Sequence, residues 1–391
     1  MPVSRRTERI MATLRPFMEG MMAADTSRPD ACDFMAGNPQ EIAGRPYVET
    51  LQKWLEPKSK RWFAYGTNTR PAQEAAAAGL SRELGLDFDP ADIFLCRGAH
   101  GGLAACLDLV VDPGDEVIYI SPPWFFYEAM ILSIGAEPVK VHVSPPAWDL
   151  DIAAIEAAIT DRTAALLINT PHNPTGKIYP PETLAALGEM LERRNAGRPR
   201  PIYVISDEAY SRILFPGATM HSPASHYAHS LLVHTYSKQA LAPGQRLGYI
   251  ALPPGLPDRE ALRIPLFATA LGSSNATPDA VMVYALPEIE QMSVDLAALA
   301  RRRDWMCSAL EEMGYELTVP DSTFYVLPKV PGGDEQGFVA RLARDGVLVL
   351  PGRACDLPGY FRISLTATDD MVERSLPVFQ AAISELQPAP G

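Results

Sequence analysis

Short aliphatic runs alternate with longer stretches of helical spacing over the first three quarters of the chain. Four runs rich in aliphatic and β-branched residues, at 115–120, 164–168, 201–206 and 231–234, are typical of strands buried on both faces. Between them, residues 151–158 and 181–195 space their apolar side chains as amphipathic helices do. This alternation predicts an α/β fold.

The pattern changes after about residue 285. A long helical stretch runs through Arg301 to Leu310, and strand-like runs follow at 324–327 and 347–350. A chain of 391 residues is also long for one hydrophobic core. We therefore expect two domains.

Composition narrows the class of protein. The hydrophobic content of 47% and charged content of 21% are typical of a globular chain without membrane spans. A net charge of −13 argues against nucleic-acid or anionic-membrane partners, which require a basic surface. The cysteines lack any CxxC pair, which predicts reduced thiols in a cytoplasmic protein and no zinc site. They are Cys32, Cys96, Cys106, Cys307 and Cys355.

Candidate chemistry gathers where the predicted strands end, the place at which open α/β sheets bind ligands. Lys238 follows Thr235 and Ser237 and precedes Arg246. An amine beside hydroxyls and an arginine suits imine formation next to a bound phosphate. Asp207 ends the run before it and could pair with a ring nitrogen of an aldehyde cofactor, or simply cap the following helix.

Five separated motifs resemble those of the class I/II aminotransferases in order and spacing. They are 169–176, Asp207 with Tyr210, Ser237 with Lys238, Arg246, and 361–364. The resemblance runs from about Gly37 to Arg362. It implies pyridoxal 5′-phosphate (PLP) and the fold type I scaffold: a large domain at 45–285 on a mainly parallel seven-stranded sheet, a smaller α/β domain at 286–391, and an N-terminal segment at 1–44 packing with the small domain.

The resemblance also implies cofactor contacts. Asp207 would keep the ring nitrogen protonated, Tyr210 and Asn173 would bond the ring oxygen, and Trp124 would stack on the ring. The phosphate would be held by the backbone amides of Ala99 and His100, and by Thr235, Ser237 and Arg246. The alternatives are a packed aromatic for Tyr210 and Trp124, and a surface ion pair for Arg246. Phe125 and Phe126 are expected to be core aromatics.

His100 departs from the family, which commonly has a small polar residue or Lys there. It would touch the phosphate or merely fill space. The adjacent Gly101 and Gly102 suggest a close approach to the backbone, which raises the question of whether a standard substrate fits.

Substrate contacts follow from the same resemblance. Arg362 would clamp the α-carboxylate, with Gly37 and Asn173 beside it, and Asn173–Pro174 is expected to be cis. Arg45 and Arg263 are candidates for holding a second carboxylate. Tyr65 and residues 269–275 would complete the neighbouring subunit's phosphate site in a homodimer.

These motifs predict an aminotransferase that moves an amino group from an α-amino acid to a 2-oxo acid through an imine on Lys238. An alternative is a PLP-dependent lyase or cyclising enzyme that resembles the aminocyclopropane-carboxylate synthases. A PLP-sensing transcription regulator is a third possibility, but about 40 residues before the matched region leave no room for a DNA-binding domain.

Overall fold

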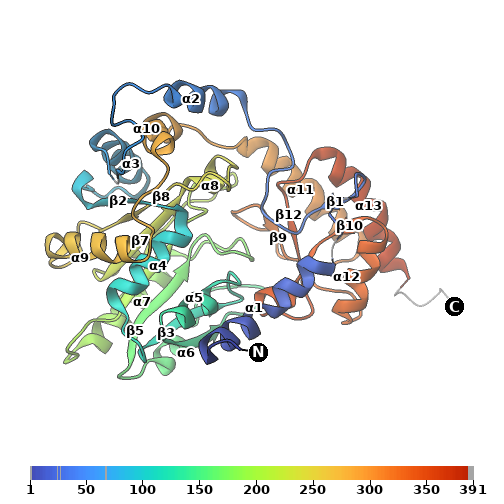
Figure 1. The fold of residues 1–391 in the computed structure, drawn as a ribbon. Coiled ribbons are helices and arrows are strands. Elements are labelled where there is room, and N and C mark those ends of the chain that lie inside the picture. The colour runs from blue at the N-terminus through green and yellow to red at the C-terminus, as the bar shows by residue number, and fades with distance from the viewer. Residues whose placement is uncertain (1, 24, 27, 67, 386–391) are drawn as a thin grey trace.

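The computed structural model describes residues 2–23, 25–26, 28–66 and 68–385, which form two lobes (Figure 1). The larger lobe is built on a seven-stranded sheet with the order β2-β8-β7-β6-β5-β3-β4. Only β8 runs antiparallel to its neighbours, so the predicted mainly parallel sheet is confirmed. Its strands are β2 (Ile93–Cys96), β3 (Glu116–Ser121), β4 (Glu137–His142), β5 (Thr163–Asn169), β6 (Tyr203–Asp207), β7 (Ser230–Thr235) and β8 (Gly248–Ala251).

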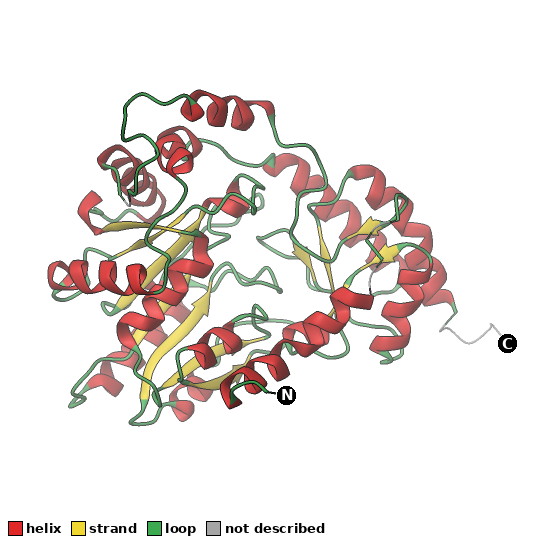
Figure 2. Ribbon diagram, viewed as in Figure 1, coloured by secondary structure: helices red, strands yellow, loops and turns green. Residues whose placement is uncertain are grey.

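The central strands are buried on both faces because helices cover the sheet from both sides (Figure 2). Successive residues of β5 show this, since side chains alternate between the faces of a strand. Ala165 and Leu167 pack in one cluster with helix α4, whereas Leu166 and Ile168 pack in another with helix α7. The aliphatic runs in the sequence are therefore these strands.

Helices of the larger lobe begin where the sequence supplies caps and prolines. The side chain of Asp151 accepts a hydrogen bond from Ala154 N and caps α6, and Pro181 opens α7. The helices are α2 (Arg45–Leu55), α3 (Arg70–Leu84), α4 (Gly98–Val110), α5 (Tyr127–Ser133), α6 (Ile152–Ala158), α7 (Pro181–Asn195), α8 (Tyr236–Gln239), α9 (Arg259–Gly272) and α10 (Ala280–Ile289).

The smaller lobe holds two short sheets. One has the order β11-β12-β9, and the other pairs β1 with β10 in parallel. Its elements are β1 (Cys32–Asp33), α11 (Leu296–Met313), β9 (Tyr325–Val326), α12 (Glu335–Arg344), β10 (Val347–Leu348), β11 (Leu350–Pro351), the 3-10 turn η3 (Gly352–Cys355), β12 (Phe361–Ser364) and α13 (Asp369–Ser384). The bounds predicted for the three segments of the chain, 1–44, 45–285 and 286–391, stay a prediction.

The first helix, α1 (Arg5–Ala23), lies between the two lobes (Figure 1). It packs against α5 of the larger lobe and against η3 of the smaller one. Helix α1 therefore covers one side of the cavity that lies between the lobes.

All five cysteines are free, in agreement with the predicted thiols, and all five are buried. Within the described residues, no helix combines the length and apolar character needed to cross a membrane.

Candidate active site

One cavity of about 430 Å³ collects the predicted site residues. It lies where the carboxyl ends of β6 and β7 face the smaller lobe, as the strand-end argument requires. Every residue predicted to bind the cofactor or the α-carboxylate from within the same chain lines it. The sequence motifs, which are up to 325 positions apart between Gly37 and Arg362, therefore meet in one place.

Asp207 ends β6 and is 4% exposed. Its Oδ2 accepts a hydrogen bond of 2.6 Å from the Tyr127 hydroxyl, and its Oδ1 accepts one of 3.2 Å from Ala209 N. Burial raises the pKa of Asp207 to about 6, against the effect of these donors. The carboxylate is thus oriented on one side and open to the cavity.

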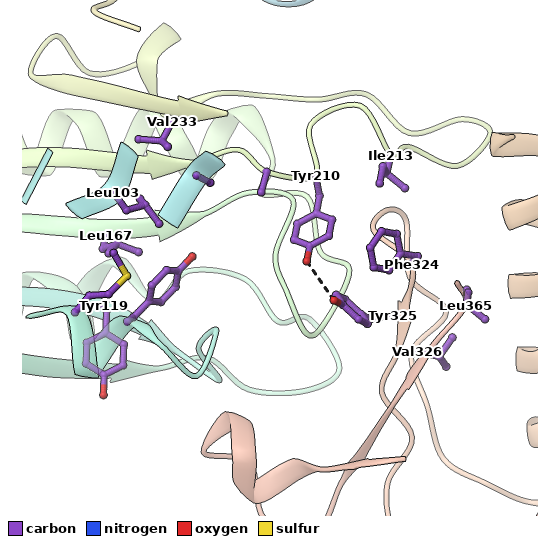
Figure 3. Close-up of a cluster of buried hydrophobic side chains, with 14 of the residues drawn as sticks. Leu103, Tyr119, Leu167, Tyr210, Ile213, Val233, Phe324, Tyr325, Val326 and Leu365 are labelled. Carbon is purple, nitrogen blue, oxygen red and sulfur yellow. Dashed lines mark hydrogen bonds between the residues drawn. The ribbon is translucent and has the colours of Figure 1, made fainter. Parts of the chain in front are cut away.

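Lys238 lies on the short helix α8, with Nζ 5.7 Å from the ring centres of both Tyr210 and Phe324. The Tyr210 hydroxyl donates to Tyr325 Oη over 3.3 Å, and Figure 3 shows these two rings reaching toward each other from the two lobes. Burial by itself raises the pKa of Tyr325, but the charges of Arg362 and Lys238 outweigh it and lower that pKa. The amine therefore lies among aromatic rings, with two buried hydroxyls nearby.

Hydroxyls and a guanidinium gather at the start of α4 and α8. Thr235 caps α8, accepts a hydrogen bond from Ser237 N and donates to Ser237 Oγ over 3.0 Å. Arg246 Nη1 lies 3.3 Å from that Oγ. At Gly98, which has φ +70°, a Cβ would come within 2.8 Å of Arg246 Nη2, so only glycine fits this turn. The cluster combines free helix N–H groups, hydroxyls and a positive charge, which suits an anion.

Arg362 on β12 joins three distant segments. Its Nη1 donates to Asn173 Oδ1 and its Nη2 to Met35 O, both over 2.9 Å. The guanidinium also lies 4.0 Å from the Tyr325 ring centre. Nε is buried, and among the described residues it has no hydrogen-bond partner. The side chain is fixed and retains a donor for a ligand.

Aromatic rings form another wall of the cavity. Trp124 packs edge to face with His100 at 5.6 Å and with Phe126 at 5.1 Å. Phe125 and Phe126 also line the cavity, so the expectation that they are only core aromatics is wrong. They follow Trp124 in the turn before α5, and both rings contact Phe17 of α1.

Other predictions have clear outcomes. Asn173–Pro174 is cis, as predicted. Gly101 and Gly102 do meet close neighbours, but these are Asn275 and Val233, since a Cβ at either glycine would lie 2.6 Å from their side chains. The close approach is therefore internal packing and does not limit the substrate.

Tyr65 lies outside the cavity, with its side chain 98% exposed. Arg45 and Arg263 also lie outside it. Arg45 pairs with Glu49 over 2.8 Å, and Arg263 pairs with Asp92 over 2.7 Å. Within this chain, neither arginine reaches the cavity to hold a second carboxylate.

The sequence reasoning missed several lining or supporting residues. Tyr127 supports Asp207, and Tyr325, Phe17 and Met21 line the cavity. Tyr127 could have been identified from its position three residues after Trp124, and Tyr325 from its place in the strand-like run at 324–327. Phe17 and Met21 carry no motif, because only the path of α1 between the lobes brings them here.

The cavity fits a phosphorylated ring aldehyde on the grounds of its own chemistry. It offers one amine at Lys238, one buried carboxylate at Asp207, and the anion cluster of Thr235, Ser237 and Arg246. The glycine at position 98 keeps the space beside Arg246 clear. These are the groups needed to hold an aldehyde carbon, a ring nitrogen and a phosphate, respectively.

Known proteins are similar over nearly the whole chain. The family model described as aminotransferase class I and II matches residues 33–378. The probable aspartate/prephenate aminotransferase of Thermus aquaticus is 31% identical over 360 residues, covering 87% of this chain and 90% of the relative. The aspartate/prephenate aminotransferase of Thermus thermophilus is also 31% identical, over 363 residues and 90% of each chain.

Solved structures agree with the sequence comparison. An amino transferase from Eubacterium rectale has a TM-score of 0.90 and 25% identity, covering 99% of this chain and 100% of its own. The N-succinyldiaminopimelate aminotransferase of Mycobacterium tuberculosis has a TM-score of 0.84 and 25% identity, covering 98% and 100%. Nothing in these similarities favours the lyase alternative. The chain belongs to the class I and II aminotransferase family and is a PLP-dependent enzyme of the fold type I scaffold that acts on amino acids and keto acids.

Proposed function

We propose that this aminotransferase works at the cavity between its lobes, with Lys238 as its catalytic amine and Arg362 as its carboxylate anchor. One observation carries the proposal: Lys238, Asp207, Arg246 and Arg362 come from separate segments and line the same cavity. A structural role alone would not require an amine, a carboxylate and two guanidinium groups around one space, since burying charge is costly.

At the cofactor end, the residues hold and tune PLP. Thr235, Ser237 and Arg246, with the amides of Ala99 and His100, bind the phosphate. Asp207 would stabilise positive charge on the ring nitrogen, and Trp124 would cover the ring and exclude water. Asn173 would donate to the ring oxygen, and the Tyr210 hydroxyl would donate there in place of its bond to Tyr325. Bound PLP supplies the aldehyde that takes up the amino group and the ring that withdraws electrons from Cα.

At the substrate end, Arg362 binds the α-carboxylate and fixes the orientation of Cα. Its Nε, which has no partner among the described residues, and its Nη groups offer the donors, while Asn173 and the Met35 carbonyl hold the guanidinium in place. Gly37 lines the same cavity, and only glycine fits there because a Cβ would come within 2.5 Å of Tyr325 Oη. The Lys238 amine would remove a proton from Cα in the first half of the reaction and return a proton to Cα in the second half.

An absorbance assay tests this proposal. Purified holoenzyme is mixed with single amino acids, and both the loss of the cofactor's absorbance band and the release of the matching 2-oxo acid are measured. We expect both signals together for at least one amino acid. Release of ammonia in place of transfer to the cofactor would instead favour the lyase alternative.

The proposed active unit is a homodimer in which Tyr65 completes the neighbouring phosphate site. Large apolar side chains are exposed on residues 42–65 and on α9, which supports a covered face. They include Ile42, Leu55, Phe63, Tyr65, Ile264 and Leu271. A groove of about 820 Å³ between α2 and the loop after Lys238 adjoins this face. Each copy of a two-fold dimer would present the same surface to the other.

Sedimentation of the holoenzyme at nanomolar concentration tests the assembly. We expect a dimer. We also expect Tyr65→Phe to weaken PLP binding without dissociating the dimer. A fully active monomer would refute both expectations. The cytoplasmic location expected from the free thiols also stays a prediction, which fractionation of the source cells would test.

A further inference from the structure

One wall of the cavity has no role in holding the cofactor or the α-carboxylate. It is made by Phe17 and Met21 on α1, by Phe125 and Phe126 before α5, and by Met35. All five side chains are apolar. This wall is the surface left for the side chain of a substrate whose carboxylate is held by Arg362.

The wall is a packed aromatic cluster. The rings of Phe17 and Phe125 stack with their centres 4.0 Å apart at 14°, and Phe126 meets Phe17 edge on at 5.7 Å. All three rings are only half-buried, so each keeps surface open to the cavity. Aromatic faces and edges of this kind bind another ring or a branched alkyl group well.

Helix α1 is held over the cavity by contacts at both lobes. Arg9 forms a two-point pair with Glu137 on β4, at 2.9 and 2.6 Å. Phe17 and Met21 are four residues apart, so they lie on one face of the helix, whereas Met22 is 83% exposed. The wall is thus presented by one particular helix face.

The lysine and the two arginines that line the cavity already have proposed roles. Lys238, Arg246 and Arg362 serve the amine, phosphate and α-carboxylate sites. His100 packs against Trp124 and Phe126, and burial together with the charge of Arg246 lowers its pKa, which disfavours a charged ring. A second carboxylate placed on this wall would lose water and meet apolar side chains, which is costly.

We infer that the preferred amino acid carries a large apolar side chain, aromatic or branched aliphatic, bound on the wall of Phe17, Met21, Phe125 and Phe126. The inference rests on the proposed function, because Arg362 must hold the α-carboxylate. It departs from the acidic substrate in the names of the curated relatives.

Binding of unreactive carboxylates to the holoenzyme tests this without turnover. Calorimetric titration would compare 3-phenylpropanoate with succinate, which carry the same anchor and differ at the far end. We expect 3-phenylpropanoate to bind roughly tenfold more tightly or better. Tighter binding of succinate, whichever subunit supplied the cation, would overturn the inference.

Rates separate this inference from the function itself. For the half-reaction, kcat/KM would be measured with L-phenylalanine, L-leucine, L-alanine and L-aspartate. A preference for aspartate would overturn the inference and leave the aminotransferase proposal standing. If none of a full panel of amino acids reacted, the proposed function would fail, and the carboxylate titration would still decide the nature of the wall.

Variants on α1 locate the wall. Phe17→Ala should lower kcat/KM for L-phenylalanine roughly 10- to 100-fold. Phe17→Leu should lower it roughly threefold. The rate with L-alanine, whose side chain is too short to reach the wall, should change less than about threefold. Met22→Ala, on the same helix but facing outward, is the matched control and should behave as wild type. An equal loss of kcat/KM for both amino acids in Phe17→Ala would overturn the role of Phe17.

Discussion

The two ends of the cavity are built in different ways. The proposed cofactor end takes five of its residues, Asp207, Thr235, Ser237, Lys238 and Arg246, from one span of 40 residues, on or next to adjacent strands of the large sheet. Its other residues in the cavity follow β2, β3, β5 and β6 of the same sheet. The substrate end draws on segments around Phe17, Met35, Tyr325 and Arg362, which lie far apart in the sequence and mostly in the smaller lobe or in α1.

This difference separates shared chemistry from specificity. Groups at the ends of buried parallel strands are fixed by the sheet itself, so the cofactor end is rigid. The substrate end depends on how α1 and the smaller lobe pack against the sheet. Substitutions at the cofactor end should therefore remove activity toward every amino acid, and those on the wall should change which amino acid reacts.

The largest effect is expected from Lys238→Ala. Lys238 supplies the one amine among the described residues that line the cavity, so without it turnover should fall below detection while the protein stays folded. Borohydride reduction followed by mass spectrometry should also find no cofactor bound covalently. A variant that still carries a reducible covalent bond, or still turns over normally, would show that another residue is the catalytic amine.

The next largest effect is expected from Asp207→Asn. The amide keeps the shape of the side chain but not its charge, so the cofactor should stay bound and kcat should fall roughly 100- to 1,000-fold. Cofactor content by absorbance and kcat by oxo-acid release would be measured on the same sample. Near-normal kcat would reassign Asp207 to capping the segment after β6.

The sequence predicted the cofactor end because strand ends and motif residues coincide there. Asp207 and Lys238 follow aliphatic runs that the sequence pattern predicted to be buried strands. Helix α7 begins at Pro181 and ends at Asn195, as its apolar spacing predicted. Phe17 and Met21 could not be predicted, because their position depends on long-range packing of α1 and on no local signal. Gly101 was recognised as a site of close approach, but its neighbour Asn275 is 174 positions away and was not predictable.

At the substrate end, Arg362→Lys tests the two-point anchor. A lysine keeps the charge, but its single ammonium cannot donate to Asn173, Met35 and a carboxylate with the same geometry. We expect kcat/KM to fall about 100-fold for all amino acids, because Cα is no longer oriented. Absorbance at saturating PLP would confirm a loaded cofactor end. A loss confined to one amino acid would place Arg362 on the side-chain wall instead.

The smallest effect on activity is expected at Glu208, the neighbour of Asp207 outside the cavity. Its Oε1 accepts hydrogen bonds from Ser206 and Ser222, over 2.7 and 2.5 Å, and burial raises its pKa from 4.5 to about 8. Between these two values the folded protein keeps a proton that the unfolded chain has lost. The free energy of unfolding therefore falls as the pH rises through this range, by on the order of a few kcal/mol from this group.

Glu208→Gln should remove that slope and leave kcat within about twofold, since the amide keeps an oxygen for both serines and the residue does not line the cavity. Urea unfolding at pH 5, 6.5 and 8 would measure the slope, and Glu182→Gln on the exposed start of α7 is the matched control that should retain it. A large loss of kcat in Glu208→Gln would mean that the cofactor end extends behind Asp207, and the contrast between the two ends of the cavity would have to be redrawn.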